Sequence, residues 1–256
     1  MILYKYVDFD TACLIMENST LKFSKSSSFN DPFELTSLFY DKEGPLNQHL
    51  LKHIAASESY GILSLTRTPL NPLMWAHYAR GDKVLVSHAI ELDHNNRSHA
   101  GVVFGIDVDM AGFNNDGQNV IPAKYGSVIY TSTRPRHPFE NSENHGVYEG
   151  LLYNFQPELL EALQRVFLYK SFHWSYEEEV RVVRNTCGQP FKEIQCLTRD
   201  CFKEVYLGIR NSFNNDYLLN VRAKILKSFP DCNIYVCRYD ESEWLFKRVL
   251  LEDVIK

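Results

Sequence analysis

The chain lacks the features that mark membrane-spanning and secreted proteins. Its 256 residues contain no apolar run of about 18 residues, the length that a transmembrane helix requires. The N-terminal segment from Met1 to Asp10 lacks the charged-then-apolar layout of a signal peptide. These absences favour a cytoplasmic protein without a membrane partner.

Cysteine pairs, charge of one sign and linker-like segments are also scarce. None of the six cysteines forms a Cys-x-x-Cys pair and the histidines complete no zinc spacing, so we expect free thiols and no structural metal. A net charge of −5 argues against a protein that coats nucleic acid through its overall field. No linker rich in proline, glycine or serine divides the chain, so the sequence predicts a single domain over residues 1–256.

The composition and pattern of the residues predict a globular chain with interspersed strands and helices. Hydrophobic residues make up 45% of the chain and charged residues 23%, which is ordinary for a folded domain. The order of elements predicts an α+β fold with a central mixed or antiparallel sheet flanked by helices. Predicted strands cover residues 2–7, 21–25, 60–66, 101–107, 128–130, 202–207, 233–238 and 243–250. Predicted helices cover residues 10–18, 45–58, 157–169 and 216–229, with another after Asn71-Pro72.

The most informative segment runs from Lys170 to Val183 and combines aromatic, acidic and basic residues with β-branched ones. The valines favour a strand, in which side chains alternate between faces. Glu177, Glu179 and Arg181 would then share one face. Such a row is either a solvated surface with a cross-strand ion pair or a polar site, and the neighbouring Trp174 and Tyr176 favour the site.

Several other side chains have both a structural and a functional interpretation. Asn30-Asp31-Pro32 is a turn signal, which would leave Asp31 and Glu34 facing solvent or a cleft. Trp75 lies on the apolar stripe of its predicted helix, which favours core packing, while His77 lies off that stripe at a surface or the edge of a pocket.

Five blocks in order along the chain resemble the bacterial family DUF2971, a domain of unknown function. They are Leu3-Tyr-Lys-Tyr6, Leu21–Ser24 leading to Phe29–Glu34, Leu73–Ala79, Lys170–Arg181 and Val205–Arg210. The chain departs from the family pattern between the tryptophan-containing helix and a His-x-Gly segment, here His99-Ala-Gly101. About twenty residues, Arg80 to Ser98, are predicted to be an insertion.

At the level of fold, the opening of the chain is similar to ADP-ribosyltransferase-like domains. Those domains hold NAD with a polar residue of the first strand, a later serine-containing strand and a glutamate near the end. The resemblance implies Glu179 as the carboxylate on the ribose 2′-OH and Glu177 as its catalytic partner. It also implies Ser64 on the middle strand, although Lys5 stands where those domains have arginine or histidine.

The resemblance therefore implies an enzyme that uses NAD as a substrate, with an expected role in phage defence or a toxin system. It would transfer ADP-ribose to a protein or nucleic-acid acceptor or hydrolyse NAD. The expected cofactor contacts are Lys5, Tyr6, Ser64, Trp174, Tyr176 and Arg181. The expected rim of the site consists of Asp31, Glu34, Trp75 and His77.

Two alternatives use the same residues. A metal-dependent nuclease would hold Mg²⁺ with four carboxylates near Lys170. A module without catalytic activity would bind a nucleotide or unstacked bases in an aromatic and basic pocket. The nuclease ligands would be Asp31, Glu34, Glu177 and Glu179, and the pocket would consist of Trp75, His173, Trp174, Tyr176 and Arg181.

Overall fold

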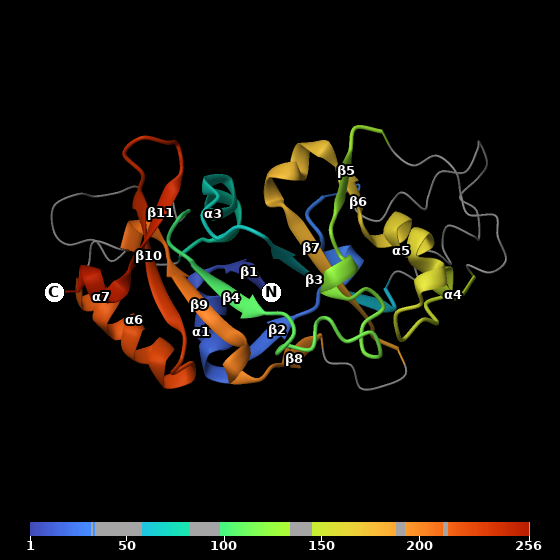
Figure 1. Cartoon of the computed structure of the whole chain (residues 1–256), viewed down its shortest axis with the longest axis horizontal. Coiled ribbons are helices and arrows are strands. Elements are labelled where there is room, and N and C mark those ends of the chain that lie inside the picture. Colours follow the sequence, from blue (N-terminus) through green and yellow to red (C-terminus); the bar gives the residue numbers. More distant parts are fainter. Residues whose placement is uncertain are drawn as a thin grey trace. The chain divides into compact units, whose positions relative to one another are not determined.

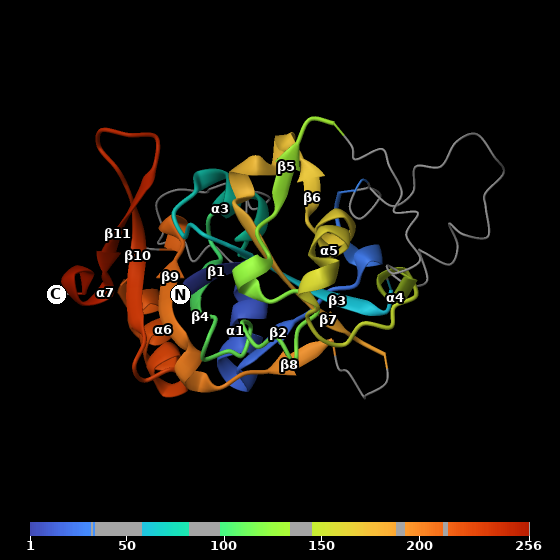
Figure 2. The same cartoon turned by 45° about the vertical axis from the view of Figure 1, so that its right-hand side comes forward.

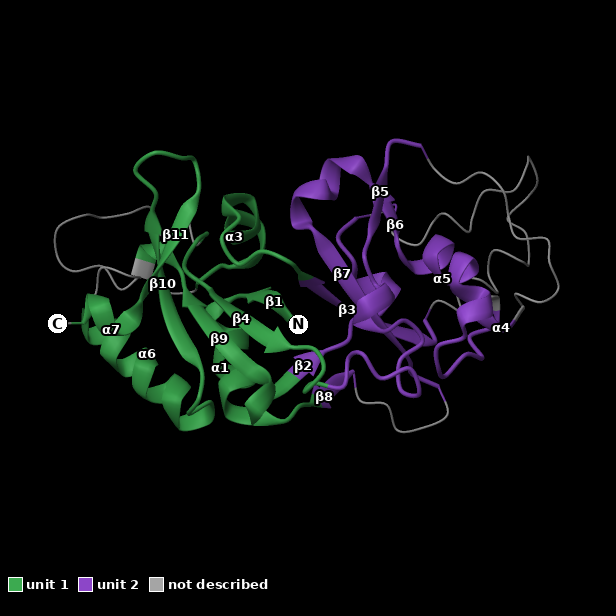
Figure 3. Ribbon diagram, viewed as in Figure 1, with its two compact units in different colours: residues 1–20, 66–111, 196–256 green, residues 21–65, 112–195 purple. Residues whose placement is uncertain are grey.

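The computed structural model divides the chain into two compact units (Figure 3). Unit 1 contains residues 1–20, 66–111 and 196–256, and unit 2 contains residues 21–65 and 112–195. Each unit is assembled from segments that alternate along the chain. The interpretation of residues 1–256 as a single domain stays a prediction. The structure describes residues 1–31, 33, 58–81, 98–133, 145–187, 193–211 and 215–255. Glu34, nearly all of the helix expected at 45–58 and most of the segment from 80 to 98 lie outside these residues.

Unit 1 is built on five strands of the main sheet (Figure 1). Neighbouring strands are antiparallel except for the parallel pair β9 and β10, so the sheet is mixed as the sequence predicted. In hydrogen-bonding order these strands are β11 (Phe246–Leu250), β10 (Asn233–Tyr239), β9 (Phe202–Leu207), β4 (Val102–Asp107) and β1 (Ile2–Val7). At the edge of these strands, Tyr4 of β1 also pairs in antiparallel register with Thr66, which belongs to unit 1.

The helices of unit 1 begin and end where the sequence supplies capping groups. Helix α1 (Phe9–Asn18) starts at Asp8, whose carboxylate accepts a hydrogen bond from Thr11 N, and it ends at Ser19 in the left-handed region. Helix α3 (Pro72–Tyr78) follows the Asn71 cap, as predicted. Helices α1 and α6 (Asn215–Ser228) lie side by side (Figures 1 and 2). The short helix α7 (Leu251–Val254) follows β11 directly.

Unit 2 contains the neighbouring strands β3 and β7, further short strands and helix α5 (Leu160–Phe167). This helix lies within the residues predicted to be helical, 157–169, and its Leu163, Val166 and Phe167 are buried in the core of the unit. The Tyr60 ring meets Phe167 edge-on, with 5.0 Å between ring centroids. The strands are β3 (Tyr60–Thr66), β7 (Glu179–Asn185), β5 (Ile129–Thr131), β6 (Tyr169–Ser171), β2 (Thr20–Lys22) and β8 (Ile194–Cys196). The remaining helix is the single turn α4 (His145–Tyr148).

The strand predicted over residues 176–183 begins later than expected. Residues Phe172–Glu177 form the 3₁₀ helix η6, whose first turn is capped by the Ser171 hydroxyl. Glu178 ends this helix in the left-handed region, with φ of 44°, and β7 starts at Glu179. Capping and the tight turn outweigh the β propensity of the sequence, so Glu177 does not belong to the strand, and the prediction that it shares a strand face with Glu179 and Arg181 is wrong.

Candidate functional site

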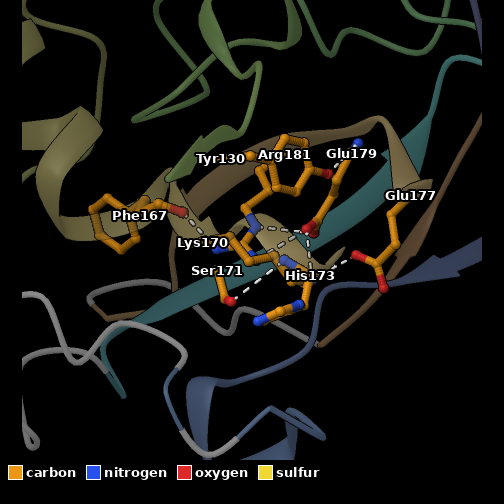
Figure 4. Close-up of polar contacts among 8 residues, drawn as sticks. All are labelled: Tyr130, Phe167, Lys170, Ser171, His173, Glu177, Glu179 and Arg181. Atoms are coloured by element: carbon orange, nitrogen blue, oxygen red, sulfur yellow. Dashed lines mark hydrogen bonds and ion pairs between the residues drawn. The ribbon is translucent and has the colours of Figure 1, made fainter. Parts of the chain in front are cut away.

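Four charged side chains are buried together in unit 2 (Figure 4). Lys170 is 8% exposed, Glu177 4%, Glu179 5% and Arg181 1%. We call these four residues the charge cluster. Its two carboxylates and two cations balance in formal charge, which is the condition under which charges are tolerated in a protein interior.

The Lys170 ammonium joins the two glutamates. Its Nζ lies 2.6 Å from Glu177 Oε2 and 3.0 Å from Glu179 Oε2. The same ammonium lies 5.2 Å from the centroid of the Trp174 ring, within the range of a cation–π contact. The Lys170 ammonium therefore contacts both carboxylates and lies close to the Trp174 ring.

Arg181 binds Glu179 in the bidentate geometry that suits a guanidinium and a carboxylate. Its Nε donates to Oε1 at 2.9 Å and its Nη2 donates to Oε2 at 3.0 Å. Its Nη1 donates to the Phe167 carbonyl oxygen at 2.6 Å, and the Phe29 ring lies 5.6 Å from Cζ. These contacts satisfy a side chain that would otherwise be costly to bury.

The cluster keeps Glu179 ionised. Burial by itself raises the pKa of this carboxyl, but Arg181 and Lys170, with hydrogen bonds from Arg181 and Ser64, lower it to about 2. The Glu179 backbone N–H donates to the Tyr130 hydroxyl oxygen at 2.9 Å, and burial raises the pKa of that phenol. At neutral pH the site therefore presents an anionic carboxylate beside a protonated phenol.

Three local elements position the cluster. Lys170 comes from β6, Glu177 from the end of η6, and Glu179 and Arg181 from β7. The left-handed turn at Glu178 separates the two glutamates, yet both carboxylates reach the Lys170 ammonium (Figure 4). Gly126 approaches β7 so closely that a Cβ there would collide with the Arg181 carbonyl oxygen.

The aromatic residues predicted to flank the site are present and partly exposed. The Trp174 and Tyr176 rings are tilted against one another at 6.1 Å between centroids. Burial and then the charge of Glu177 raise the pKa of the Tyr176 phenol. Both side chains belong to η6, so this short helix places aromatic surface next to buried charge.

The structure brings together six of the predicted site residues in unit 2. Of the two interpretations of this segment, the solvated charged face is wrong for Glu177, Glu179 and Arg181, because these side chains are buried and hydrogen-bonded. The six are Ser64, Trp174, Tyr176, Glu177, Glu179 and Arg181.

Four other predicted residues belong to unit 1. Lys5 and Tyr6 are consecutive in β1, so their side chains project from opposite faces of the strand. Tyr6 OH donates to the Thr68 carbonyl oxygen at 3.0 Å, and its ring meets the Trp75 ring edge-on at 5.4 Å. Trp75 is fully buried and its Nε1 donates to Pro69 O at 2.8 Å, which supports the core interpretation. His77 is exposed in the last turn of α3.

Asp31 forms the turn that the sequence indicated, since its Oδ1 accepts from Phe33 N at 2.9 Å. The sequence predicts that Asp31 faces solvent or a cleft, and its burial contradicts the solvent alternative. Sequence reasoning did not find Tyr130, Phe29 or the Phe167 carbonyl, which contact the cluster from distant parts of the chain. No local pattern marks these three residues.

The carboxylates of the cluster are neutralised by side chains. Within the described ranges, no group of three or more histidine, cysteine, aspartate or glutamate residues has an arrangement that could hold a metal ion. No helix in the described part of the chain is long and apolar enough to cross a membrane.

Fold and site together define an α+β protein with a neutralised charge cluster inside its second unit. Residues 74–182 match the family described as "Protein of unknown function (DUF2971)", which confirms the family resemblance over that segment. The matched segment includes α3 from Met74 onward, the His99-Ala-Gly101 motif and all four residues of the charge cluster. No protein with a curated description and no solved structure matches the chain.

Proposed function

We propose that this protein is an NAD-using enzyme of the ADP-ribosyltransferase type, with its reaction centre at the charge cluster. The observation that carries the proposal is the hydrogen bond of Ser64 on β3 to an ionised Glu179 on the neighbouring strand β7. A serine of a middle strand and a glutamate of a later strand are the pair that the fold resemblance implies. Glu177 supplies the second carboxylate, held by the same ammonium.

The chemistry that this pair supports is cleavage of the bond between nicotinamide and ribose. The bonding electrons leave with nicotinamide, and C1′ of the ribose acquires oxocarbenium character. Glu179 accepts a hydrogen bond from the ribose 2′-OH and stabilises the positive charge as it develops. Glu177 takes the proton of the attacking nucleophile, which is water in hydrolysis or a hydroxyl or amine of a macromolecule in transfer.

Lys170 controls access to both carboxylates in this proposal. Glu177 and Glu179 are almost fully covered, so a ribose reaches them only when the Lys170 ammonium moves away. The lysine stem is long and flexible, and the cationic nicotinamide ring can take the place of the ammonium beside Trp174. Binding of NAD then preserves the charge balance of the cluster.

The test measures NAD turnover and NAD-induced thermal stabilisation for wild type and Glu179→Gln. We expect turnover to fall by two or more orders of magnitude in the variant, the scale on which removal of a transition-state contact acts. The matched control is Glu178→Gln, which changes the adjacent but exposed glutamate and should keep wild-type turnover.

Circular dichroism must show that Glu179→Gln is folded, and Ser64→Ala provides a milder second variant. Absence of both turnover and stabilisation with NAD or ADP-ribose on wild type would refute the proposal. Stabilisation by Mg²⁺ with a chelator-sensitive nuclease activity would favour the nuclease alternative. Stabilisation by nucleotides without any turnover would favour the binding module.

A further inference from the structure

His99 in unit 1 combines two unusual features, a left-handed backbone and a buried ring nitrogen without a hydrogen-bond partner among the described residues. This residue has φ of 60°, in the left-handed region that non-glycine residues enter at some cost in conformational energy. Its Nδ1 is buried, and the described residues provide no hydrogen-bond partner for it. An orphaned nitrogen on a strained residue calls for a physical explanation.

The backbone around His99 is fixed from both sides. His99 N donates to Trp75 O at 3.2 Å, and both Ala100 N and Gly101 N donate to Ala79 O. From the other side, Arg210 N donates to His99 O at 3.3 Å. Tertiary contacts therefore hold the left-handed conformation, and His99 cannot relax it without separating α3 from the segment after β9.

Two glycines make this close packing possible. A Cβ on Gly208 would collide with the His99 carbonyl oxygen, and a Cβ on Gly101 would collide with the Val7 carbonyl oxygen. Gly208 N also donates to Gly101 O at 3.2 Å. The backbone of His99 is thus fixed next to the backbone of Arg210, and a fixed backbone restricts the positions open to the imidazole, which favours preorganised binding.

The His99 ring contacts an aromatic side chain and is influenced by a nearby cation. The Phe246 ring meets the imidazole edge-on at 5.6 Å between centroids. Burial and then the Arg210 guanidinium lower the pKa of His99, so the imidazole is neutral at physiological pH. A neutral imidazole can donate one hydrogen bond next to the guanidinium, and both groups are suited to an oxygen anion.

We propose that His99 and Arg210 form an anion-binding site in unit 1, whose ligand carries a phosphate or carboxylate group. The anion oxygen accepts the hydrogen bond of the orphaned His99 Nδ1, and the Arg210 guanidinium supplies the compensating charge. The site is separate in its residues from the charge cluster and does not rest on NAD chemistry.

The test is a titration of wild-type protein with inorganic phosphate and, separately, with succinate, followed by the imidazole NMR signals. We expect the His99 signal to shift saturably and its pKa to rise on binding, because the anion offsets the effect of Arg210. The signal of the exposed His173 serves as an internal control and should not saturate. Saturation with phosphate alone identifies a phosphate-bearing ligand, and saturation with succinate alone identifies a carboxylate.

Two variants sharpen the test. His99→Asn removes the imidazole but keeps a residue that tolerates the left-handed conformation, so the fold should survive. Arg210→Gln removes the charge and should abolish the saturable shift, whereas Arg222→Gln, in an exposed ion pair with Glu252, should not. Failure of both anions to shift the His99 signal of wild type, or an unchanged affinity in Arg210→Gln, overturns the proposal.

Discussion

Arg181 donates two hydrogen bonds to the Glu179 carboxylate, one to each oxygen, at 2.9 and 3.0 Å. The two residues are separated by a single residue of β7, so both side chains leave the same face of the strand. A bidentate pair of this kind between neighbours on one strand is buried here, whereas neighbouring charges on a strand are usually solvated.

Replacement of Arg181 should be strongly destabilising. Arg181→Ala leaves the Glu179 carboxylate buried with only part of its charge balance, and we expect a loss of about 3–5 kcal/mol in the free energy of unfolding. The control is Arg165→Ala, which breaks an exposed pair with Glu161 and should cost no more than about 0.5 kcal/mol. Urea unfolding measures both, and equal losses would contradict the role of burial.

Glu179 should make stability depend on pH in acid. Its folded pKa of about 2 lies below the ordinary value of 4.5, so its contribution is present above pH 4.5 and lost as pH falls toward 2. The shift corresponds to about 3 kcal/mol. Urea unfolding at pH 7, 5 and 3 should show a steeper loss for wild type than for Glu179→Gln. Parallel curves for the two proteins would disprove this contribution.

Lys170→Met keeps an unbranched side chain that is one atom shorter and removes the charge between two carboxylates. We expect destabilisation of about 3 kcal/mol at pH 7 and less at pH 4, because protonation relieves the repulsion between Glu177 and Glu179. Lys124→Met is a close control, since Lys124 pairs with Asp116 at 2.8 Å and lies over the Tyr125 ring, but in an exposed setting. The control should change stability by less than about 1 kcal/mol. A Lys170→Met loss that does not shrink at pH 4 would argue against repulsion as its cause.

Gly126→Ala should disrupt the backbone that supports the cluster. The added methyl group would collide with the Arg181 carbonyl oxygen. This oxygen belongs to the backbone of β7, so it can move only if the strand shifts. We expect a loss of more than about 3 kcal/mol or failure to fold. Gly146→Ala is the matched control. Gly146 lies in helix α4, and a Cβ there would meet the Leu152 side chain at 3.5 Å, an ordinary van der Waals contact. Thermal unfolding of both variants measures the two losses of stability. A Gly126→Ala variant as stable as wild type would show that β7 can move.

Local patterns predicted many elements well because their boundaries are local. Strand β3 occupies the predicted residues 60–66, and strand β9 the predicted residues 202–207. Asp8 and Asn71 cap their helices through hydrogen bonds to residues two or three positions ahead. These signals depend on near neighbours, which is the information that a sequence displays directly.

The chemistry of residues 170–181 was visible in the sequence, but its burial was not. Lysine, two glutamates and arginine in one short run indicated a polar site, and the charge balance followed from their identity. Tertiary structure decided that the run is buried, because Phe167, Tyr130 and Phe29 lie on other elements. The 3₁₀ helix η6 is bounded by local contacts, the Ser171 cap and the ion pair of Lys170 with Glu177, whose effect the valine-rich pattern concealed.

The sequence by itself determined the α+β character, the family resemblance confirmed over residues 74–182, and the residue types of the candidate site. Only the tertiary structure decided the division into two units and the distribution of the predicted residues between them, with Lys5, Tyr6, Trp75 and His77 in unit 1. The physical reason is that each unit is closed by contacts between segments far apart in the chain. Such contacts leave no composition change or linker for a sequence to show.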